Sequence, residues 1–143
     1  MSEARAVLAV LVAVLAGPEH RPASMAIQWR TDEASALAES QRLGRPLLVD
    51  AWADWCAGCK LLDRNTWSDP RVRDEVEAHF VPLRLDVSTE GTAAEVRVRA
   101  LEVTALPVVL ICPPRGCNPA ARRSVGYVKA AEMLAFLRES RGR

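Results

Sequence analysis

Two cysteines separated by two residues, Cys56 and Cys59, lie where a long apolar run gives way to a helical stretch. The run from Leu47 to Trp52 is apolar at every position except Asp50, a pattern typical of a central strand covered on both faces. Cysteines at this spacing in the first turn of a helix bring their sulfurs together. The junction therefore predicts an α/β chain with a reactive cysteine pair at the end of a buried strand.

Further candidate strands and helices alternate along the chain. Thr31 is expected to cap the first helix, Gly44 to end it, and Pro70 to occupy the first position of a later helix. Apolar spacing predicts strands over 27–30, 81–87, 108–111 and 123–125, and helices over 31–44, from 56 onward, 70–80, 92–101 and 130–138. This order favours one domain built on a central mixed β-sheet with helices on both faces.

The position of Cys56 at the start of a helix has a chemical consequence. Unpaired backbone N–H groups and the helix dipole stabilise a thiolate there, which makes Cys56 the candidate nucleophile. Cys59 lies one turn deeper and is expected to be more buried. It is the candidate for attacking the mixed disulfide that Cys56 forms with a substrate.

Asp50 is the candidate proton acceptor for Cys59, because it is the one polar residue in the apolar run. Burial of a carboxylate is costly and is expected to raise its pKa into the range useful for accepting and returning a proton. The alternative is that Asp50 is a capped or solvated residue at a strand end. Similarly, Trp52 and Trp55 are either site residues or core aromatics, with the core favoured for Trp52.

A zinc site is the main alternative reading of a Cys-x-x-Cys pair. The other two cysteines, Cys112 and Cys117, are separated by four residues. The gap from Cys59 to Cys112 is much larger than the ~15–20 residues between the two knuckles of a zinc ribbon. We therefore expect neither a metal nor another cofactor.

The segment from Leu47 to Lys60 closely resembles the active-site segment of thioredoxins. The aspartate six residues before the first cysteine, the tryptophan directly before it and the lysine after the second cysteine all match. Ala53-Asp54-Trp55-Cys56 and Thr66–Val72 are further similar to the C-terminal periplasmic domain of the DsbD thiol–disulfide interchange proteins. The resemblance covers 27–138 and implies a thioredoxin fold with thiol–disulfide oxidoreductase activity.

The same resemblance implies a substrate-binding surface around the cysteines. Leu106-Pro107 is similar to the family's cis-proline loop, which faces the cysteine pair, whereas a trans proline at a strand start is the alternative. The client is expected to contact this loop and the residues around the first cysteine. These candidate contacts are Trp55, Ala57, Gly58, Leu106 and Pro107.

Two departures from the thioredoxin pattern affect what the resemblance implies. The dipeptide Ala57-Gly58 is neither the Gly-Pro of most thioredoxins nor the Pro-His of DsbA, and this pair tunes the direction of electron flow. Pro82 stands where thioredoxins carry a lysine near the buried aspartate. Asp50 is therefore expected to lack that lysine neighbour.

Three functions compete for this sequence. A protein-disulfide reductase is favoured, because no unusual positive charge lies beside Cys56 to make its disulfide strongly oxidising. An oxidase or isomerase of the same fold is the first alternative. A non-catalytic module that binds a metal or a partner on the same scaffold is the second.

The second cysteine pair, Cys112 and Cys117, follows an apolar strand and spans Pro113-Pro114-Arg115-Gly116. In an exported protein these residues are candidates for a local disulfide. In a cytosolic protein they would be free thiols, with Cys112 as a small core residue. A second redox pair that passes electrons to Cys56 is the third interpretation.

The first 24 residues differ from the rest of the chain. Arg5 precedes an apolar run from Ala6 to Ala16, which is shorter than the ~20 residues of a membrane-spanning helix and typical of a signal peptide. We therefore predict a signal peptide and linker over 1–24, a thioredoxin-like domain over 25–143, and export to the periplasm or an equivalent compartment. If Met25 is the true start, the protein is cytoplasmic instead.

The charge balance excludes one class of partner. The chain has 19 basic and 18 acidic residues, a balance without the basic surface that nucleic-acid binding requires. We expect a monomer that acts on disulfide-containing client proteins. We also expect an upstream thiol protein, membrane-bound or soluble, to reduce the cysteine pair after each turnover.

Overall fold

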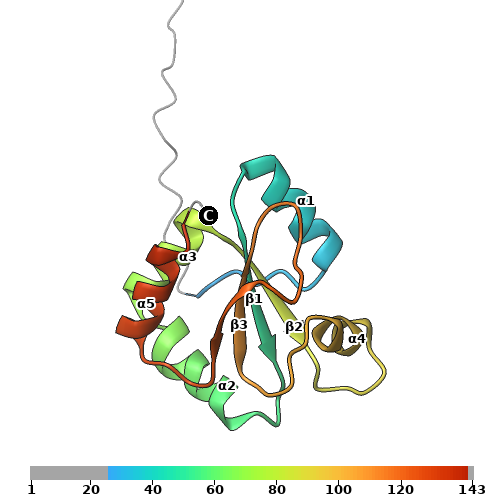
Figure 1. Ribbon diagram of the computed structural model, residues 1–143. Helices are drawn as coiled ribbons and strands as arrows, with labels where there is room; N and C mark the ends of the chain where they lie inside the picture. The colour runs from blue at the N-terminus through green and yellow to red at the C-terminus, as the bar shows by residue number, and fades with distance from the viewer. Residues whose placement is uncertain (1–25, 142–143) are drawn as a thin grey trace, which may run out of the picture.

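The apolar run predicted as a central strand, Leu47–Trp52, forms β1 in the middle of a four-stranded sheet. In this computed structural model, which describes residues 26–141, the strand order is β2-β1-β3-β4. β2 (Val81–Asp86) runs parallel to β1, β3 (Val108–Cys112) lies antiparallel to β1, and β4 (Arg122–Val125) lies antiparallel to β3 (Figure 1). The predicted mixed sheet is confirmed.

Helices cover both faces of this sheet (Figure 1). One face carries α2 (Ala57–Leu62), the π-helix η1 (Asp63–Trp67), α3 (Pro70–His79) and α5 (Ala130–Glu139). The opposite face carries α1 (Glu33–Leu43) and α4 (Ala93–Ala100). As predicted, Gly44 ends α1 with a positive φ of 63°, and Pro70 begins α3.

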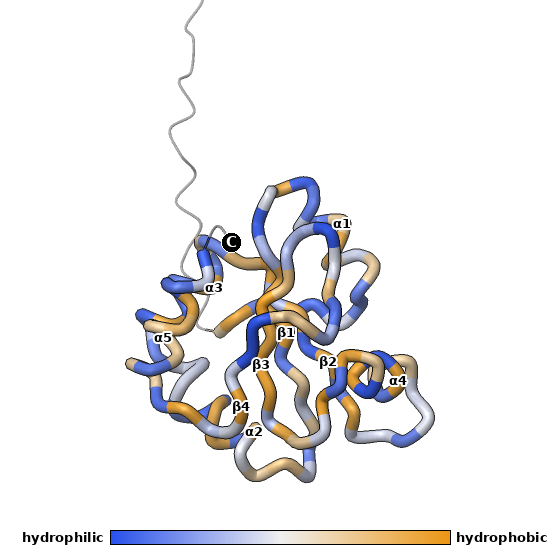
Figure 2. The backbone as a smooth tube through the Cα atoms, in the orientation of Figure 1, coloured by the Kyte–Doolittle hydropathy of each residue, from blue (hydrophilic) through white to orange (hydrophobic). Residues whose placement is uncertain are grey.

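The two faces of the sheet have separate hydrophobic cores. Leu48 packs under α3 and α5, whereas its neighbours Leu47 and Val49 pack under α1 and α4. Successive side chains of a strand point to opposite faces, so an unbroken apolar run fills both cores at once. Figure 2 shows this pattern as hydrophobic colour along β3, between the two helix layers.

Two local predictions were wrong. Thr31 does not cap α1; the side chain of Asp32 accepts a hydrogen bond from the backbone N–H of Ser35 at 2.8 Å, so Asp32 is the cap. The strand expected over 27–30 is reduced to a single bridge between Arg30 and Leu83. The other strands and helices begin and end within about two residues of the predicted positions, which is the usual uncertainty of element ends.

The prediction of a signal peptide and linker over 1–24 lies outside the described residues. Within 26–141, no helix is both long enough and apolar enough to cross a membrane. The same part of the chain contains no group of three or more His, Cys, Asp or Glu residues arranged to hold a metal ion.

Candidate active site

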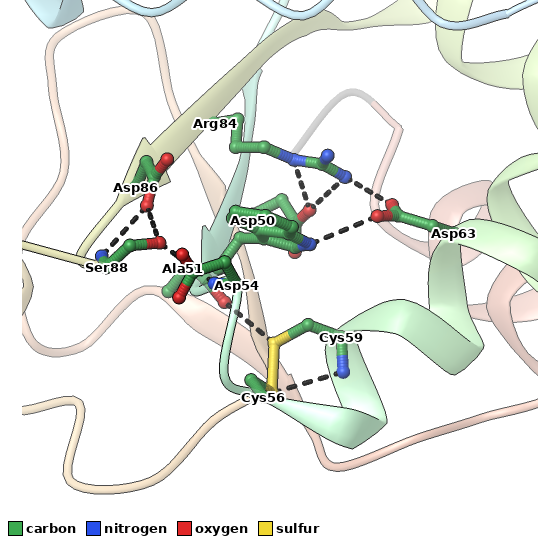
Figure 3. The surroundings of a disulfide bond; sticks show 10 residues. Asp50, Ala51, Asp54, Cys56, Cys59, Asp63, Arg84, Asp86 and Ser88 are labelled. Carbon is green, nitrogen blue, oxygen red and sulfur yellow. Dashed lines mark hydrogen bonds and ion pairs between the residues drawn. A yellow bond between two sulfur atoms is a disulfide. The ribbon is translucent and has the colours of Figure 1, made fainter.

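The cysteine pair lies at the start of α2, directly after β1. Cys56 is the N-cap of this helix, and its sulfur accepts a hydrogen bond from the backbone N–H of Cys59 at 3.1 Å. The two cysteines form a disulfide, with 5.3 Å between their Cα atoms (Figure 3). Cys56 retains 6% exposure and Cys59 has none, so the expected difference in depth is present.

Asp50 lies in β1, buried with 1% exposure, so it is not a solvated strand-end residue. Its Oδ2 accepts from Nε of Arg84 at 3.0 Å and lies 2.8 Å from Nη2, whereas its Oδ1 has no hydrogen-bond partner. Burial raises the pKa of Asp50 to about 6; Arg84 opposes this shift and the carboxylate of Asp63 adds to it. The expected rise in the pKa of Asp50 is confirmed.

Arg84 was missed by the sequence analysis. Position 82 holds no lysine, as expected, but Asp50 still has a basic neighbour, because Pro82 pairs with Leu48 in the parallel register and Arg84 pairs with Asp50. Arg84 is the one charged residue between the apolar positions of β2. A charged residue at such a position indicates a buried partner, and this pattern in the sequence could have pointed to Arg84. Its guanidinium carbon lies 4.7 Å from the ring centre of Trp29.

Asp63 is the second residue that the sequence analysis missed. Its carboxylate accepts from Nη2 of Arg84 at 2.6 Å and from the indole N–H of Trp52 at 3.1 Å (Figure 3). Arg84 thus bridges two carboxylates, one in β1 and one at the start of η1. Trp52 is a half-buried partner in this network, with its ring centre 5.3 Å from the guanidinium carbon.

The predicted loop lies against the cysteine helix. The Leu106–Pro107 bond is cis, as predicted. A Cβ atom placed on Gly58 would lie 2.8 Å from Cδ of Pro107, and Leu106 packs against the cluster that contains both cysteines. Trp55 is 66% exposed beside this contact, which excludes the core interpretation for its ring.

Cys59 is linked to the strand that carries Asp50. Its sulfur lies 4.0 Å from the carbonyl oxygen of Ala51, the residue directly after Asp50. Ala53 and Cys59 are fully buried together in the small cluster under the disulfide. The site thus combines a slightly exposed cysteine, a fully buried cysteine and a carboxyl group with a pKa of about 6.

The second cysteine pair lies at the opposite end of the sheet. Cys112 and Cys117 form a disulfide, and Cys112 pairs with Leu47 at the start of β1, whereas the active site follows the end of β1. Four residue steps separate the two ends of β3, Val108 next to the active-site loop and Cys112, which is about 13 Å at about 3.3 Å per residue. Electron transfer between the two cysteine pairs within the chain requires sulfur contact, so the relay interpretation was wrong.

Comparison with known proteins shows the family to which the chain belongs. A family model described as Thioredoxin-like matches residues 28–114, which is more than half of the chain. The chain belongs to the thioredoxin-like family. A thioredoxin from Thermus thermophilus superposes on this thioredoxin-like chain with a TM-score of 0.67 at 28% identity, over 80% of this chain and 87% of the other. The predicted thioredoxin fold is confirmed.

The resemblance to DsbD is also present in the comparisons. A thiol:disulfide interchange protein DsbD from Ralstonia nicotianae is 35% identical over 111 residues, covering 78% of this chain and 18% of the relative. The oxidised C-terminal domain of DsbD from Neisseria meningitidis superposes with a TM-score of 0.65 at 21% identity, over 79% and 99% of the two chains. This thioredoxin-like chain therefore spans less than a fifth of the full-length DsbD relatives.

The thioredoxin-like site has the parts that thiol–disulfide exchange requires. Such exchange needs one sulfur that a substrate can reach, a second sulfur to resolve the mixed disulfide, and a group that exchanges protons near neutral pH. Cys56, Cys59 and Asp50 lie together on one strand–helix unit. The fixed backbone N–H of Cys59 stabilises negative charge on the sulfur of Cys56.

Proposed function

We propose that this chain is a thiol–disulfide oxidoreductase that acts as a protein-disulfide reductase. The observation that carries the proposal is the Cys56–Cys59 disulfide at the start of α2, held against the cis Leu106–Pro107 loop. Trp55, Ala57, Gly58 and the loop form the proposed client-binding surface.

The proposed reaction begins with the reduced protein. The thiolate of Cys56 attacks one sulfur of the client disulfide, a new S–S bond forms, and the other client sulfur leaves as a thiolate that takes up a proton. Cys59 then attacks the sulfur of Cys56 and releases the second client thiolate. Two electrons have passed to the client, and the protein carries the Cys56–Cys59 disulfide.

Asp50 is proposed to take the proton that Cys59 loses when it attacks. A pKa of about 6 allows the carboxyl group to accept a proton and return it at neutral pH. Its unpartnered Oδ1 is the oxygen available for that proton, since Arg84 occupies Oδ2.

The reducing direction is supported by the charges around the pair. A strongly stabilised thiolate makes a disulfide oxidising. The guanidinium of Arg84, which contacts Asp50, is matched by the carboxylates of Asp50 and Asp63, so it adds no uncompensated positive charge there. The potential of the pair is therefore expected in the range of the thioredoxins and not in that of DsbA.

We further propose that the domain over 25–143 works after export, in the periplasm or an equivalent compartment. The Cys112–Cys117 disulfide supports this location, because such bonds persist in oxidising compartments and are rare in the cytosol. Disulfide-containing exported proteins are the proposed clients. A dithiol protein, membrane-bound or soluble, is the proposed electron donor that reduces Cys56–Cys59 again.

The deciding experiment is the equilibrium reduction potential of Cys56–Cys59 in a variant with Cys112 and Cys117 replaced by Ala. A value between about −270 and −200 mV supports the reductase, and a value near about −120 mV indicates an oxidase. Failure of the pair to form a reversible disulfide would contradict oxidoreductase activity and favour a binding module.

A further inference from the structure

A groove of about 680 Å³ opens beside the active-site disulfide, between Trp55 and α4. Its apolar lining consists of side chains from β2's end, α4 and the loop before Pro107, namely Val87, Val98, Val103 and Leu106. Leu106 also packs against the cluster that contains both cysteines, and Trp55 directly precedes Cys56, so the groove lies next to the active site. Any client that reaches Cys56 along this side passes over the groove.

The charges at the rim of the groove are unbalanced. Glu95 and Arg99 line it but form an ion pair at 2.7 Å, so they neutralise one another. Glu90 also lines it and is exposed, and among the described residues its carboxylate has no hydrogen-bond or ion-pair partner. The groove therefore has a net negative charge.

Asp54 directly precedes the lining residue Trp55 and carries a second uncompensated carboxylate next to the groove. Its backbone N–H donates to Oγ of Ser88, which lines the groove, at 2.8 Å (Figure 3). Its own carboxylate is exposed and has no partner in the described part of the chain. Lys60, the nearest lysine in the sequence, lies beyond the second cysteine and, like Asp54, is not itself a lining residue, so the lining's own net charge comes from Glu90.

We propose that this groove selects clients in which the segment next to the reactive disulfide carries an apolar residue and a lysine or arginine. This inference rests on the proposed function and names its substrate class. The apolar residue is buried on the floor of the groove, because transfer of apolar surface from water is favourable. The cationic residue lies between Asp54 and Glu90, where opposite charge steers the encounter and fixes the direction of the client chain.

The proposal distinguishes clients by charge. A cationic peptide disulfide is a good substrate, whereas an anionic peptide or a small anionic disulfide is repelled from the rim. Because both carboxylates are exposed, salt screens the effect over about 8 Å at physiological ionic strength. The preference is therefore expected to decrease as salt is added.

The test uses two peptides with the same internal disulfide and the same apolar neighbour, one with lysines and one with glutamates at the flanking positions. Fully reduced protein is mixed with each peptide, and the formation of its own disulfide is followed in a single turnover. We expect the lysine peptide to react about tenfold faster at low salt, with a smaller ratio at high salt. The double variant Asp54→Asn/Glu90→Gln is expected to lose most of this ratio.

A matched control removes the same charge elsewhere. Asp74→Asn/Glu132→Gln changes two exposed carboxylates on α3 and α5, on the other face of the sheet, and is expected to keep the ratio. Equal rates for the two peptides, or a ratio that survives in Asp54→Asn/Glu90→Gln, would overturn this inference and leave the reductase standing. Failure of the reduced protein to react with either peptide would overturn both.

Discussion

The carboxyl group of Asp50 is buried, and its ion pair with Arg84 does not fully offset the free-energy cost of removing the charged group from water. Burial raises its pKa from 3.8 to about 6, so the folded chain holds this proton more tightly than the unfolded chain does. Proton binding by Asp50 therefore adds to the free energy of unfolding at acid pH, and this contribution is lost as the pH rises from about 4 through about 6. The shift corresponds to about 3 kcal/mol of the free energy of unfolding.

Asp50→Asn is thus expected to stabilise the fold at about pH 8 by up to about 3 kcal/mol, with little gain at about pH 4, because Asn stays neutral throughout. Urea unfolding at both pH values measures this difference. Resolution of the mixed disulfide is expected to slow by about 10²-fold, since the proton acceptor is lost. Equal stabilisation at both pH values would contradict the raised pKa.

Arg84 keeps the pKa of Asp50 from rising further. In Arg84→Met the opposing charge and its hydrogen bond are lost, while Asp63 remains, so the pKa of Asp50 is expected to rise above about 6. A larger fraction of Asp50 then holds its proton at pH 7, and the exchange rate at that pH is expected to fall. Titration of the Asp50 carboxyl carbon by NMR measures the shift.

A control for this charge change is available at the edge of the sheet. Arg122 pairs with Glu139 on the surface, so Arg122→Met removes the same charge away from the site. Its effect on the pKa of Asp50 is expected to be small. A pKa that stays near 6 in Arg84→Met would show that burial alone sets it.

Single residues were predictable from the sequence where their chemistry is local. Cys56, Cys59 and Asp50 stood out because one polar residue in an apolar strand and two cysteines at a helix start are conspicuous without any structure. Arg84 was missed because its partner is set by the register between β1 and β2, which depends on packing. Asp63 was missed for a related reason, since its contact crosses from η1 to β2.

At the scale of elements, the site depends on how closely α2 approaches the loop before β3. Gly58 allows that approach, because a Cβ at this position would lie 2.8 Å from the rigid ring of Pro107. Gly58→Ala is therefore expected to push the helix and the loop apart. A decrease of about 1–3 kcal/mol in the free energy of unfolding is typical of such overpacking.

Thermal unfolding and the rate of disulfide exchange measure the effect of Gly58→Ala. Ala57→Ser is the control, because Ala57 is exposed in the same dipeptide. The free energy of unfolding is expected to change far less in the control. Unchanged stability in Gly58→Ala would mean that the helix and the loop can separate without loss.

The elements were predictable where hydrophobic periodicity is strong. The buried strands and the amphipathic α5 follow from apolar spacing alone, and both cores were implied by the two-faced run in β1. The segment over 27–30 has strand-like residues, but its one bridge to a strand is that of Arg30 with Leu83, because α1 begins soon afterwards. The choice between Thr31 and Asp32 as the cap depends on backbone angles that sequence does not specify.

At the scale of the whole molecule, the two disulfides have separate tasks. Cys56–Cys59 lies at the end of β1, where a client can approach, whereas Cys112–Cys117 closes the connection from β3 to β4 at the far end of the sheet. The carbonyl oxygen of Cys117 also accepts from Arg97 of α4 at 3.1 Å. The second disulfide is thus connected to the scaffold and not to the reacting sulfurs.

Replacing Cys112 and Cys117 by Ala is therefore expected to reduce stability and preserve reactivity. Closing a loop of this length removes entropy from the unfolded chain that corresponds to about 2 kcal/mol, so the free energy of unfolding is expected to fall by about that amount. Urea unfolding measures it, and the exchange rate of Cys56–Cys59 is expected to stay within about twofold. Cys56→Ala/Cys59→Ala gives the opposite result, with exchange abolished and the second disulfide intact. Loss of exchange in the Cys112/Cys117 variant would instead show that the second disulfide is needed for the reaction of Cys56–Cys59. The proposed separation of the two tasks would then be wrong.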